Sequence, residues 1–302
     1  MDGLLLLDKP SGPTSHDLVA GVRSLWGRPR TGHFGTLDPL ATGLLIVAVG
    51  QATRFNRFYS GRDKSYRATA RLGFATDTYD AEGTPLGSPS DSLSLPEPAA
   101  IEAALQGLRG EILQTPPAFS AKKVHGRPLY LSARAGRPVD PRPVPVVIYE
   151  MEVVRCELPE VDLEIRCSTG TYIRSLVHDL GARLGCGAHV MALRRTAVGE
   201  LGVEKALPWP LAAPVPDEPE GLSAWIPLEE MLPDWPRAEA DDDGLRALRD
   251  GRRLPSERLR SSQGGGPDAE IRVFGPDGKL AGLARRRPED GSWAPFLVIP
   301  TT

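Results

Sequence analysis

The stretch Gly32-His33-Phe34-Gly35-Thr36-Leu37-Asp38-Pro39-Leu40-Ala41-Thr42-Gly43 places one carboxylate, that of Asp38, in a segment rich in glycine, proline and threonine. Glycine and proline interrupt helices and central strands, so we predict a turn that holds Asp38. The apolar run at residues 44–49 follows directly and predicts a buried strand. Functional carboxylates often lie on loops braced by such an element, although a lone aspartate in a turn commonly bonds only its own backbone. The pattern alone leaves both interpretations open.

The composition is that of a soluble globular protein, because 40% of the 302 residues are hydrophobic and 25% are charged. The length allows one large domain and a small one. No apolar run approaches the roughly 20 residues that span a bilayer, and the N-terminus lacks the basic segment of a secretory signal. Three widely spaced cysteines, Cys156, Cys167 and Cys186, favour free thiols. We therefore expect a cytoplasmic protein without membrane association.

Charge is distributed unevenly along the chain, although its net value is only −3. Residues 1–75 carry ten Lys and Arg against five Asp and Glu, whereas residues 201–250 carry four against twelve. A basic excess of this size is compatible with nucleic-acid binding, but taken alone it is more typical of an ordinary solvated surface.

Periodicity predicts alternating strands and helices along the first two hundred residues. Ser15 is a suitable N-cap for a helix that ends near Trp26. The apolar face of this helix is expected to carry Leu18, Val19, Val22 and Leu25. Residues 65–72 alternate as a strand with Tyr66 on its apolar side. The other expected elements are a strand at 3–7, a loop at 88–98, a helix at 101–108, strands at 144–154 and 161–167 paired across Pro159-Glu160, and a helix at 172–184 that stops at Gly185.

The last third of the chain has a different composition. Residues 208–236 are rich in proline and acidic residues, which is typical of a linker, and we expect Trp209, Leu228 and Met231 to dock on the main domain. Residues 271–274 and 280–284 flank Gly275-Pro276-Asp277-Gly278 and predict a hairpin, with one more strand at 296–299. We therefore predict a small β-rich module at 237–302, interrupted by a glycine-rich insert at 261–267.

Several candidate sites are rejected on spacing. Cys186-Gly187-Ala188-His189 lacks the second pair of ligands that a zinc site requires, so no metal site is predicted. The glycines at 32–35 match neither a P-loop nor a dinucleotide fingerprint, and no Gly-x-Ser-x-Gly elbow supports a hydrolase. Without further information, the pattern favours a core aromatic for Tyr66 and a structural histidine for His33. For Arg174 it leaves a surface arginine and a functional one equally open.

The segment around Asp38 resembles the catalytic motif of the TruB-type tRNA pseudouridine synthases. The resemblance covers about the first two hundred residues and becomes weak beyond them. Other segments that match this family in order are Leu7-Asp8-Lys9-Pro10-Ser11-Gly12, Asp63-Lys64-Ser65-Tyr66, Leu72-Gly73, Thr76-Asp77-Thr78-Tyr79-Asp80-Ala81-Glu82-Gly83, Pro116-Pro117-Ala118-Phe119-Ser120-Ala121-Lys122-Lys123, Gly170-Thr171-Tyr172-Ile173-Arg174-Ser175, Gly185-Cys186-Gly187-Ala188-His189 and Leu193-Arg194-Arg195. The position of residues 237–302 resembles that of the PUA-type RNA-binding domain that ends many members.

The resemblance implies an α+β fold and an active site. The fold is a catalytic domain at 1–236 with a mixed, mainly antiparallel sheet and flanking helices, followed by the PUA-like module at 237–302. Asp38 is the implied essential carboxylate, and Arg174 keeps it ionised and oriented. Tyr66 stacks on a flipped uracil and takes part in proton transfer at C5. A phenol has an ordinary pKa near 10, so the role of a base would require help from the surroundings of Tyr66.

Further residues are expected to contact the RNA. By resemblance, Tyr172 and Leu193 line the uracil pocket and His33 lies near the flipped nucleotide. Phe34 and Thr169 depart from the family pattern, since relatives commonly have a smaller residue and a lysine there. The candidates for phosphate contacts are Lys9, Lys64, Arg67, Lys122, Lys123 and Arg127, because cations near the motifs would orient an RNA backbone.

The function that these expectations imply is the isomerisation of uridine 55 in the T arm of tRNA to pseudouridine, by a monomer that needs no metal, cofactor or obligatory protein partner. Whether Asp38 attacks C1′ or removes a ribose proton is left open. Two alternatives remain: a protein that folds or binds tRNA without chemistry, and a guide-RNA-dependent relative.

Overall fold

The structure is a computed structural model that carries side chains. It describes residues 1–86, 95–120, 122–124, 126–135, 141–211, 219, 221–261 and 269–300. Most of the predicted loop at 88–98, nearly all of the insert at 261–267 and part of the segment 208–236 lie outside these ranges, as does the side chain of Lys123.

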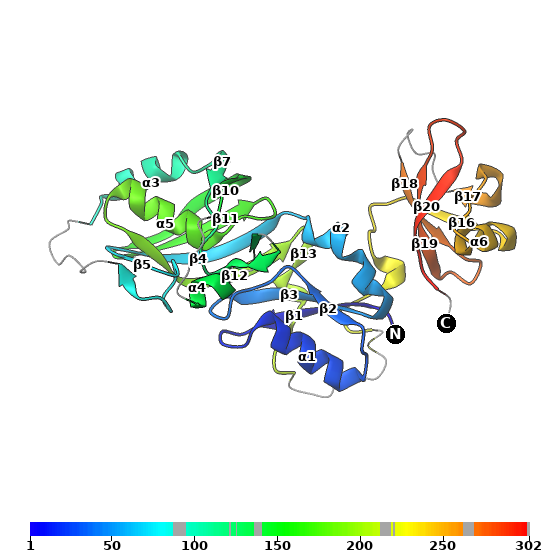
Figure 1. Cartoon of the computed structure of the whole chain (residues 1–302), viewed down its shortest axis with the longest axis horizontal. Coiled ribbons are helices and arrows are strands. Elements are labelled where there is room, and N and C mark those ends of the chain that lie inside the picture. Colours follow the sequence, from blue (N-terminus) through cyan, green and yellow to red (C-terminus); the bar gives the residue numbers. More distant parts are fainter. Residues whose placement is uncertain are drawn as a thin grey trace.

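One large sheet forms the main body (Figure 1). Its eleven strands follow the order β14-β1-β3-β12-β4-β11-β10-β7, with β13, β15 and β2 paired to β12, β1 and β3. The strands are β1 (Gly3–Lys9), β2 (Thr31–Phe34), β3 (Thr42–Val49), β4 (Lys64–Leu72), β7 (Gly110–Gln114), β10 (Val144–Glu157), β11 (Glu160–Cys167), β12 (Ala188–Val198), β13 (Leu201–Gly202), β14 (Leu207–Pro208) and β15 (Trp225–Pro227). Among the described strand pairs of this sheet, only β1–β14 and β3–β12 are parallel, which confirms the predicted mixed, mainly antiparallel sheet.

The burial of the central strands follows their sequence patterns. Residues 44–49 of β3 are fully buried, as expected for a continuous apolar run covered on both faces. In β4, Tyr66 and the alternate residues after it are buried while Arg67 is exposed, so this strand has one covered and one open face. β10 and β11 pair antiparallel across the turn at residues 158–159, as predicted.

Helix α1 (Ser15–Trp26) begins at Ser15, the residue that was predicted to be its N-cap. Thr14 is the N-cap and forms a capping box with Asp17, so the prediction of Ser15 as the cap is wrong. The Ser15 side chain instead accepts a hydrogen bond from the Leu37 amide and donates one to the Leu37 carbonyl. Leu25, which was expected on the apolar face, is 52% exposed.

Helices α3 and α5 cover the β10 and β12 side of the sheet (Figure 1). α5 (Ile173–Leu184) ends at Gly185, whose φ of +71° is the left-handed conformation that glycine adopts easily. α3 (Pro98–Gln106) starts earlier than predicted because Pro98 occupies its first turn. The short elements are α2 (Asn56–Ser60), α4 (Leu129–Arg134), η1 (Gly50–Phe55), η2 (Val203–Lys205), η3 (Leu228–Glu230), and the pairs β5 (Ala75–Thr76) with β6 (Pro85–Leu86) and β8 (Lys123–Val124) with β9 (Arg127–Pro128). None of the helices in the described ranges is long and apolar enough to cross a bilayer.

The C-terminal module is β-rich, as predicted, and forms a separate five-stranded sheet in the order β17-β16-β18-β19-β20. Its elements are β16 (Arg237–Ala240), α6 (Asp242–Arg249), η4 (Ser256–Arg258), β17 (Leu259–Ser261), β18 (Glu270–Phe274), β19 (Leu280–Arg286) and β20 (Trp293–Val298). β18 and β19 form the predicted hairpin. Sequence periodicity missed α6, because this eight-residue helix buries only two leucines, Leu245 and Leu248, with Gly244.

The segment before the module packs on the main sheet. Trp225, Leu228 and Met231 belong to the main hydrophobic core, and β15 pairs with β1. Phe58 of α2 lies 5.2 Å from Trp235 and 6.3 Å from Phe296 between ring centroids, so an aromatic cluster joins the two sheets. The expected docking of Trp209, Leu228 and Met231 on the main domain is therefore confirmed, and the described part of residues 208–236 is more closely packed than its linker-like composition indicated.

We predict that Gly181→Ala destabilises the protein, because the added Cβ of this α5 residue would lie 2.1 Å from the Ala188 amide nitrogen of β12. Alanine favours helix by up to about 1 kcal/mol over glycine, but forcing α5 away from β12 costs about 2 kcal/mol. Urea unfolding measures the difference. The matched control is Ala182→Gly at the next, exposed position, which loses only helix propensity. A Gly181→Ala variant as stable as the unsubstituted chain would contradict this packing constraint.

Candidate active site

A cavity of about 610 Å³ opens beside Asp38, against strands β4, β10 and β12 of the main sheet. Its volume is within the range usual for small-molecule and cofactor sites. The walls come from the loop after β2, from β4 and β12, and from the segment before α5. Asp38, Tyr66, Tyr172, Leu193, Lys64, Lys122 and Arg195 are among the residues that line it.

The loop that carries Asp38 is fixed from several sides. Ser15 holds Leu37 through both backbone groups, and the Gly12 amide donates to the Pro39 carbonyl at 2.9 Å. Within the loop, the Ala41 amide donates to the Asp38 carbonyl at 3.1 Å. The predicted turn is therefore present, and its anchors are the segments at residues 9–15.

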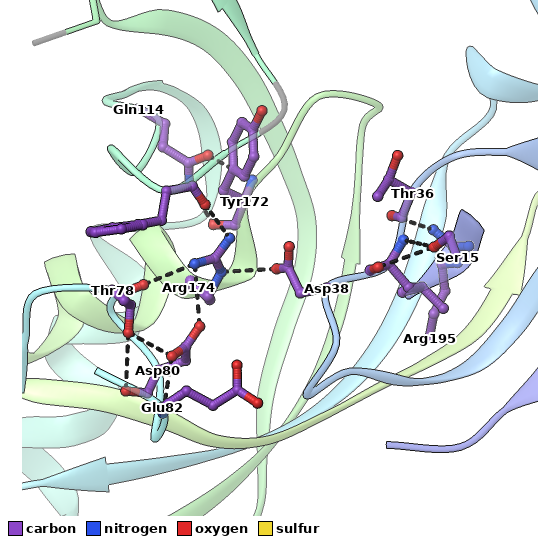
Figure 2. A network of polar contacts seen from close by, with 12 residues as sticks. Ser15, Thr36, Asp38, Thr78, Asp80, Glu82, Gln114, Tyr172, Arg174 and Arg195 are labelled. Carbon is purple, nitrogen blue, oxygen red and sulfur yellow. Dashed lines mark hydrogen bonds and ion pairs between the residues drawn. The ribbon is translucent and has the colours of Figure 1, made fainter. Parts of the chain in front are cut away.

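Arg174 makes an ion pair with Asp38, with 2.9 Å between Nε and Oδ2 (Figure 2). The arginine side chain is 6% exposed, whereas that of Asp38 is 38% exposed. The carboxylate is thus held by a buried cation while part of it still faces the cavity. This arrangement orients an ionised carboxylate toward whatever occupies the cavity.

The other nitrogens of Arg174 reach parts of the chain far from Asp38. Nη1 donates to the Thr78 carbonyl at 2.9 Å and pairs with Asp80 Oδ2 at 3.2 Å, and Nη2 donates to the Phe119 carbonyl at 2.8 Å. Figure 2 shows the guanidinium between the two carboxylates. Arg174 is therefore a buried residue, and the alternative of a surface arginine is wrong.

Asp80 is the principal site residue that sequence reasoning missed. It is buried, and Oδ1 accepts hydrogen bonds from Thr78 Oγ1 at 2.6 Å and from the Glu82 amide at 3.1 Å. The only signal in the sequence was its place in a segment that matches the family. A carboxylate in a turn with threonine and glycine otherwise reads as a turn former.

The turn that presents Asp80 has an unusual backbone. Tyr79 has a φ of +65°, which is costly for a residue with a bulky side chain. Its ring stacks on His178 of α5 with 3.8 Å between centroids. The stack ties the turn to the same helix that carries Arg174.

Tyr66 lies on the covered face of β4 and lines the cavity. Burial raises the pKa of Tyr66 to about 12, although the nearby charge and hydrogen bond of Arg195 act to lower it. The phenol is therefore neutral around pH 7. Arg195 is a further residue without an assigned role in the sequence predictions, and its guanidinium is almost completely buried.

Tyr172 and Leu193 both lie at the cavity wall. Gln114 fixes the backbone of Tyr172 on both sides, since its amide donates to the Tyr172 carbonyl at 3.0 Å and its oxygen accepts from the Tyr172 amide at 2.8 Å (Figure 2). Burial raises the pKa of the Tyr172 phenol. The structure thus brings Asp38, Tyr66, Tyr172 and Leu193 to one cavity.

His33 lies on β2 and is not among the residues that line the cavity. Burial lowers the pKa of His33, and its Nδ1 is a buried atom without a hydrogen-bond partner among the described residues. Phe34 is buried and stacks on Tyr59, with 5.5 Å between ring centroids. An RNA contact by His33 stays a prediction.

Lys9 does not lie where a phosphate contact requires it. It is fully buried and donates to the carbonyls of Ala41, Pro10 and Pro39 at 2.7, 2.9 and 3.0 Å. The prediction of Lys9 as a phosphate contact is wrong in this structure, because its ammonium group is used to hold the Asp38 loop.

Lys64 is also buried, although it reaches the cavity wall. Its ammonium group donates to the carbonyls of Arg62 at 2.7 Å and Ser60 at 3.0 Å, and to Thr169 Oγ1 at 3.4 Å. Because these acceptors occupy its ammonium group, Lys64 is not free to contact an RNA phosphate in this structure. Among the other candidates, Lys122 lines the cavity and Arg67 pairs with Glu164 on the open face of the sheet.

The segment with cysteine and histidine at metal-like spacing has other partners. Cys186 Sγ approaches the Gly187 carbonyl, and His189 Nδ1 lies 3.0 Å from the Phe74 carbonyl. Within the part of the chain that the structure describes, no three His, Cys, Asp or Glu residues gather as a metal site would need.

Two family models match the chain. The model for the N-terminal domain of the TruB family pseudouridylate synthases matches residues 23–173, which contain Asp38 and Tyr66. The model for the C-terminal domain of tRNA pseudouridylate synthase B matches residues 174–209, which begin at Arg174. Neither model reaches residues 237–302.

Curated relatives extend the similarity over the whole chain. The tRNA pseudouridine synthase B of Burkholderia mallei is 40% identical over 302 residues, which are 100% of this chain and 98% of the relative. The protein of the same name from Sodalis glossinidius is 45% identical over 255 residues, 82% of this chain and 81% of the relative.

Solved structures support the fold. An H/ACA RNP bound to a substrate RNA containing 2′-deoxyuridine includes a chain with a TM-score of 0.71 and 24% identity, covering 99% of this chain and 85% of that one. A Cbf5-Nop10-Gar1 complex includes one with a TM-score of 0.70 and 26% identity, covering 98% and 84%.

The fold, together with a carboxylate at the wall of a cavity that is paired with a buried arginine, agrees with these matches and defines the class of the pseudouridylate synthases, which isomerise uridine in RNA. The chain belongs to the TruB family of this class, and the resemblance seen in its sequence motifs is confirmed.

We predict that Lys9 makes stability depend on pH in the alkaline range. Burial lowers the pKa of Lys9 from 10.5 to about 8 in the folded protein. Between these values the unfolded chain binds more protons than the folded one, so the free energy of unfolding rises with pH. In Lys9→Met this contribution is absent. The slope of the free energy of unfolding against pH is therefore lower than in the unsubstituted chain, by up to about 1.4 kcal/mol per pH unit.

Urea unfolding at several pH values between 8 and 10 measures both slopes. The pKa of Lys64 is also lowered, but Lys64 is present in both proteins, so its contribution cancels when the two slopes are compared. The control is Lys205→Met at an exposed position, where the slope stays that of the unsubstituted chain. Equal slopes for the unsubstituted chain and Lys9→Met would show that Lys9 keeps an ordinary pKa.

Proposed function

We propose that this protein isomerises uridine 55 in the T arm of tRNA to pseudouridine, without metal or cofactor, and that Asp38 is the essential carboxylate. The observation that carries the proposal is the ion pair between Asp38 and the buried Arg174 at the wall of a cavity lined by Tyr66 and Tyr172. The names of the curated relatives, tRNA pseudouridine synthase B, support tRNA as the substrate. A tRNA substrate also implies that the protein works in the cytoplasm.

The reaction requires that the target nucleotide leaves its base stack and enters the cavity. Unstacking costs a few kcal/mol, which contacts with the flipped base must offset. Tyr66, Tyr172 and Leu193 offer apolar surface for this purpose. The N1–C1′ bond then breaks, the base turns, and C5 bonds to C1′. C5 next loses its hydrogen as a proton, and N1 takes up a proton, so the atoms of the nucleoside are conserved.

Asp38 has two possible roles in this sequence, and both require its ionised form. It either bonds to C1′ as the base departs or takes the C2′ proton to give a glycal. Arg174 supports both roles, because it stabilises the negative charge and fixes the direction of the carboxylate.

Tyr66 acts by contact with the base more readily than as a free phenolate. Burial raises its pKa to about 12 even though Arg195 acts to lower it, so Tyr66 would first have to lose its own proton before it could accept one from C5. Stacking or packing against the uracil requires no ionisation. We therefore assign Tyr66 first to holding the flipped base.

The guide-RNA-dependent alternative would require further RNA or protein components, and the similar chain of the Cbf5-Nop10-Gar1 complex is found with protein partners. The higher identity of the curated tRNA enzymes, 40% over the full chain, favours action on tRNA without a guide. Activity of the isolated protein on a bare tRNA transcript would distinguish the two, since dependence on a guide RNA or a protein partner would leave that transcript unmodified.

We predict that Asp38→Asn lowers the single-turnover rate by at least about three orders of magnitude, because the amide can neither attack nor accept a proton. Tritium release from C5-labelled uridine in a tRNA transcript measures the rate. Binding of the transcript should persist, since this substitution keeps the size of the side chain. Undiminished tritium release would contradict the proposed mechanism.

The same variant tests the alternative of a tRNA-folding protein. If binding and remodelling of the T arm were the whole function, Asp38→Asn would rescue a strain that lacks the gene in every phenotype. Loss of isomerisation together with full rescue would assign the required role to tRNA folding.

We predict that Asp80→Asn lowers kcat about 10- to 100-fold with little change in KM. Losing the charge of Asp80 weakens one charge-assisted hydrogen bond to Arg174, worth about 1.5–3 kcal/mol, and leaves Arg174 less firmly directed at Asp38. The control is Asp77→Asn in the same turn, at an exposed carboxylate outside this network. A KM increase alone, or equal losses in both variants, would contradict the assigned role of Asp80.

A further inference from the structure

Three buried cations surround the Asp38 loop and the cavity without a carboxylate partner among the described residues. Lys9 and Lys64 donate to backbone carbonyls and one hydroxyl. Arg195 donates to the carbonyls of Leu44 at 2.8 Å, Gly35 at 3.0 Å and Thr36 at 3.4 Å. Only Arg174 is balanced by carboxylates, those of Asp38 and Asp80.

Arg195 is the most buried of the cavity-lining cations, with 1% of the residue exposed. It interacts with the hydroxyl of Tyr66, and its charge also lowers the pKa values of Lys9, Lys64 and His33. Burial is the largest cause of these lowered pKa values, and the charge of Arg195 adds to it. Arg195 and Lys64 lie near each other, because Nη1 of Arg195 and Cε of Lys64 would be 3.3 and 3.7 Å from a Cβ added to Gly35.

Such an arrangement is costly for stability. A buried charge loses its hydration, and carbonyl groups offset this loss less well than a carboxylate would. Hydrogen bonds to the loop could be supplied by a neutral donor. The excess of positive charge at the wall of the cavity is therefore better explained by an anion that forms there during the reaction.

Pseudouridine formation, as proposed above, generates such an anion in either mechanism for Asp38. When the C1′–N1 bond breaks, its electron pair stays on N1 and spreads to O2 and O4 of the uracil. The negative charge of Asp38 is at the same time lost, either to a bond with C1′ or to the C2′ proton. Negative charge thus moves from the carboxylate beside Arg174 to the base in the cavity, before the base uses its electrons at C5 to bond to C1′.

We infer that Arg195, assisted by Lys64, stabilises the departing uracil anion, so that the two cations are electrostatic contributors to breaking the glycosidic bond. This inference rests on the proposed function and adds to it a role for the residues beneath the cavity. Arg174 then serves the carboxylate before bond cleavage, and Arg195 serves the base after it.

The test compares uridine with 5-fluorouridine at the target position of a tRNA transcript. Fluorine withdraws electrons and makes the base a better leaving group, so its departure depends less on positive charge from the protein. Single-turnover loss of the starting nucleoside is followed by mass spectrometry after digestion. We expect Arg195→Gln to slow the uridine substrate about 100-fold and the fluorinated one by about tenfold or less.

Lys64→Gln is the second variant, and it keeps the inference testable if Arg195→Gln does not fold. It should show the same preference with a smaller loss. The matched control is Arg194→Gln at the adjacent arginine, which pairs with Asp8 at 2.7 Å and is absent from the wall of this cavity. This control should change both substrates by the same small factor.

The outcomes separate the two proposals. Equal losses for both substrates in Arg195→Gln, or in Lys64→Gln where only that variant folds, would assign the cations to positioning the loop and overturn the inference. A protein without substitutions that converts neither transcript would instead overturn the proposed function.

Discussion

The site depends on one buried guanidinium, that of Arg174. It joins the loop of Asp38, the turn of Asp80 and the carbonyl of Phe119, three parts of the chain that are distant in sequence. A buried cation must have its donors satisfied, or the cost is several kcal/mol. Each of these segments therefore has to reach its observed place for Arg174 to be buried at all, and the same contacts direct the carboxylate of Asp38 into the cavity.

Unlike Arg174, the two buried lysines near the cavity donate to backbone carbonyls and not to carboxylates. Lys9 donates to carbonyls of the Asp38 loop, and Lys64 donates to the segment before β4. Burial lowers the pKa of both lysines to about 8, which marks how much hydration they have lost. Both ammonium groups are therefore occupied by acceptors of the chain itself. The inferred role of Arg195 and Lys64 would give this costly arrangement a chemical purpose.

Periodicity was reliable where an element buries a regular pattern. The strand at residues 44–49, the β10–β11 pair and the helix that stops at Gly185 were all predicted within a few residues. Periodicity was unreliable where a contact of one side chain with a distant residue determines the start of an element. Thr14 rather than Ser15 caps α1, because Ser15 is committed to Leu37, a residue 22 positions away.

Local sequence determined that Asp38 lies in a rigid turn before a buried strand, since glycine and proline fix such a turn wherever they occur. Family resemblance then named Arg174, Tyr66, Tyr172 and Leu193. Only the tertiary structure decided that Asp80 shares Arg174 with Asp38, and that Lys9 and Arg195 are buried beneath the loop. The reason is physical: a charged side chain in a sequence has no fixed partner or dielectric surroundings, and both arise when distant segments pack together.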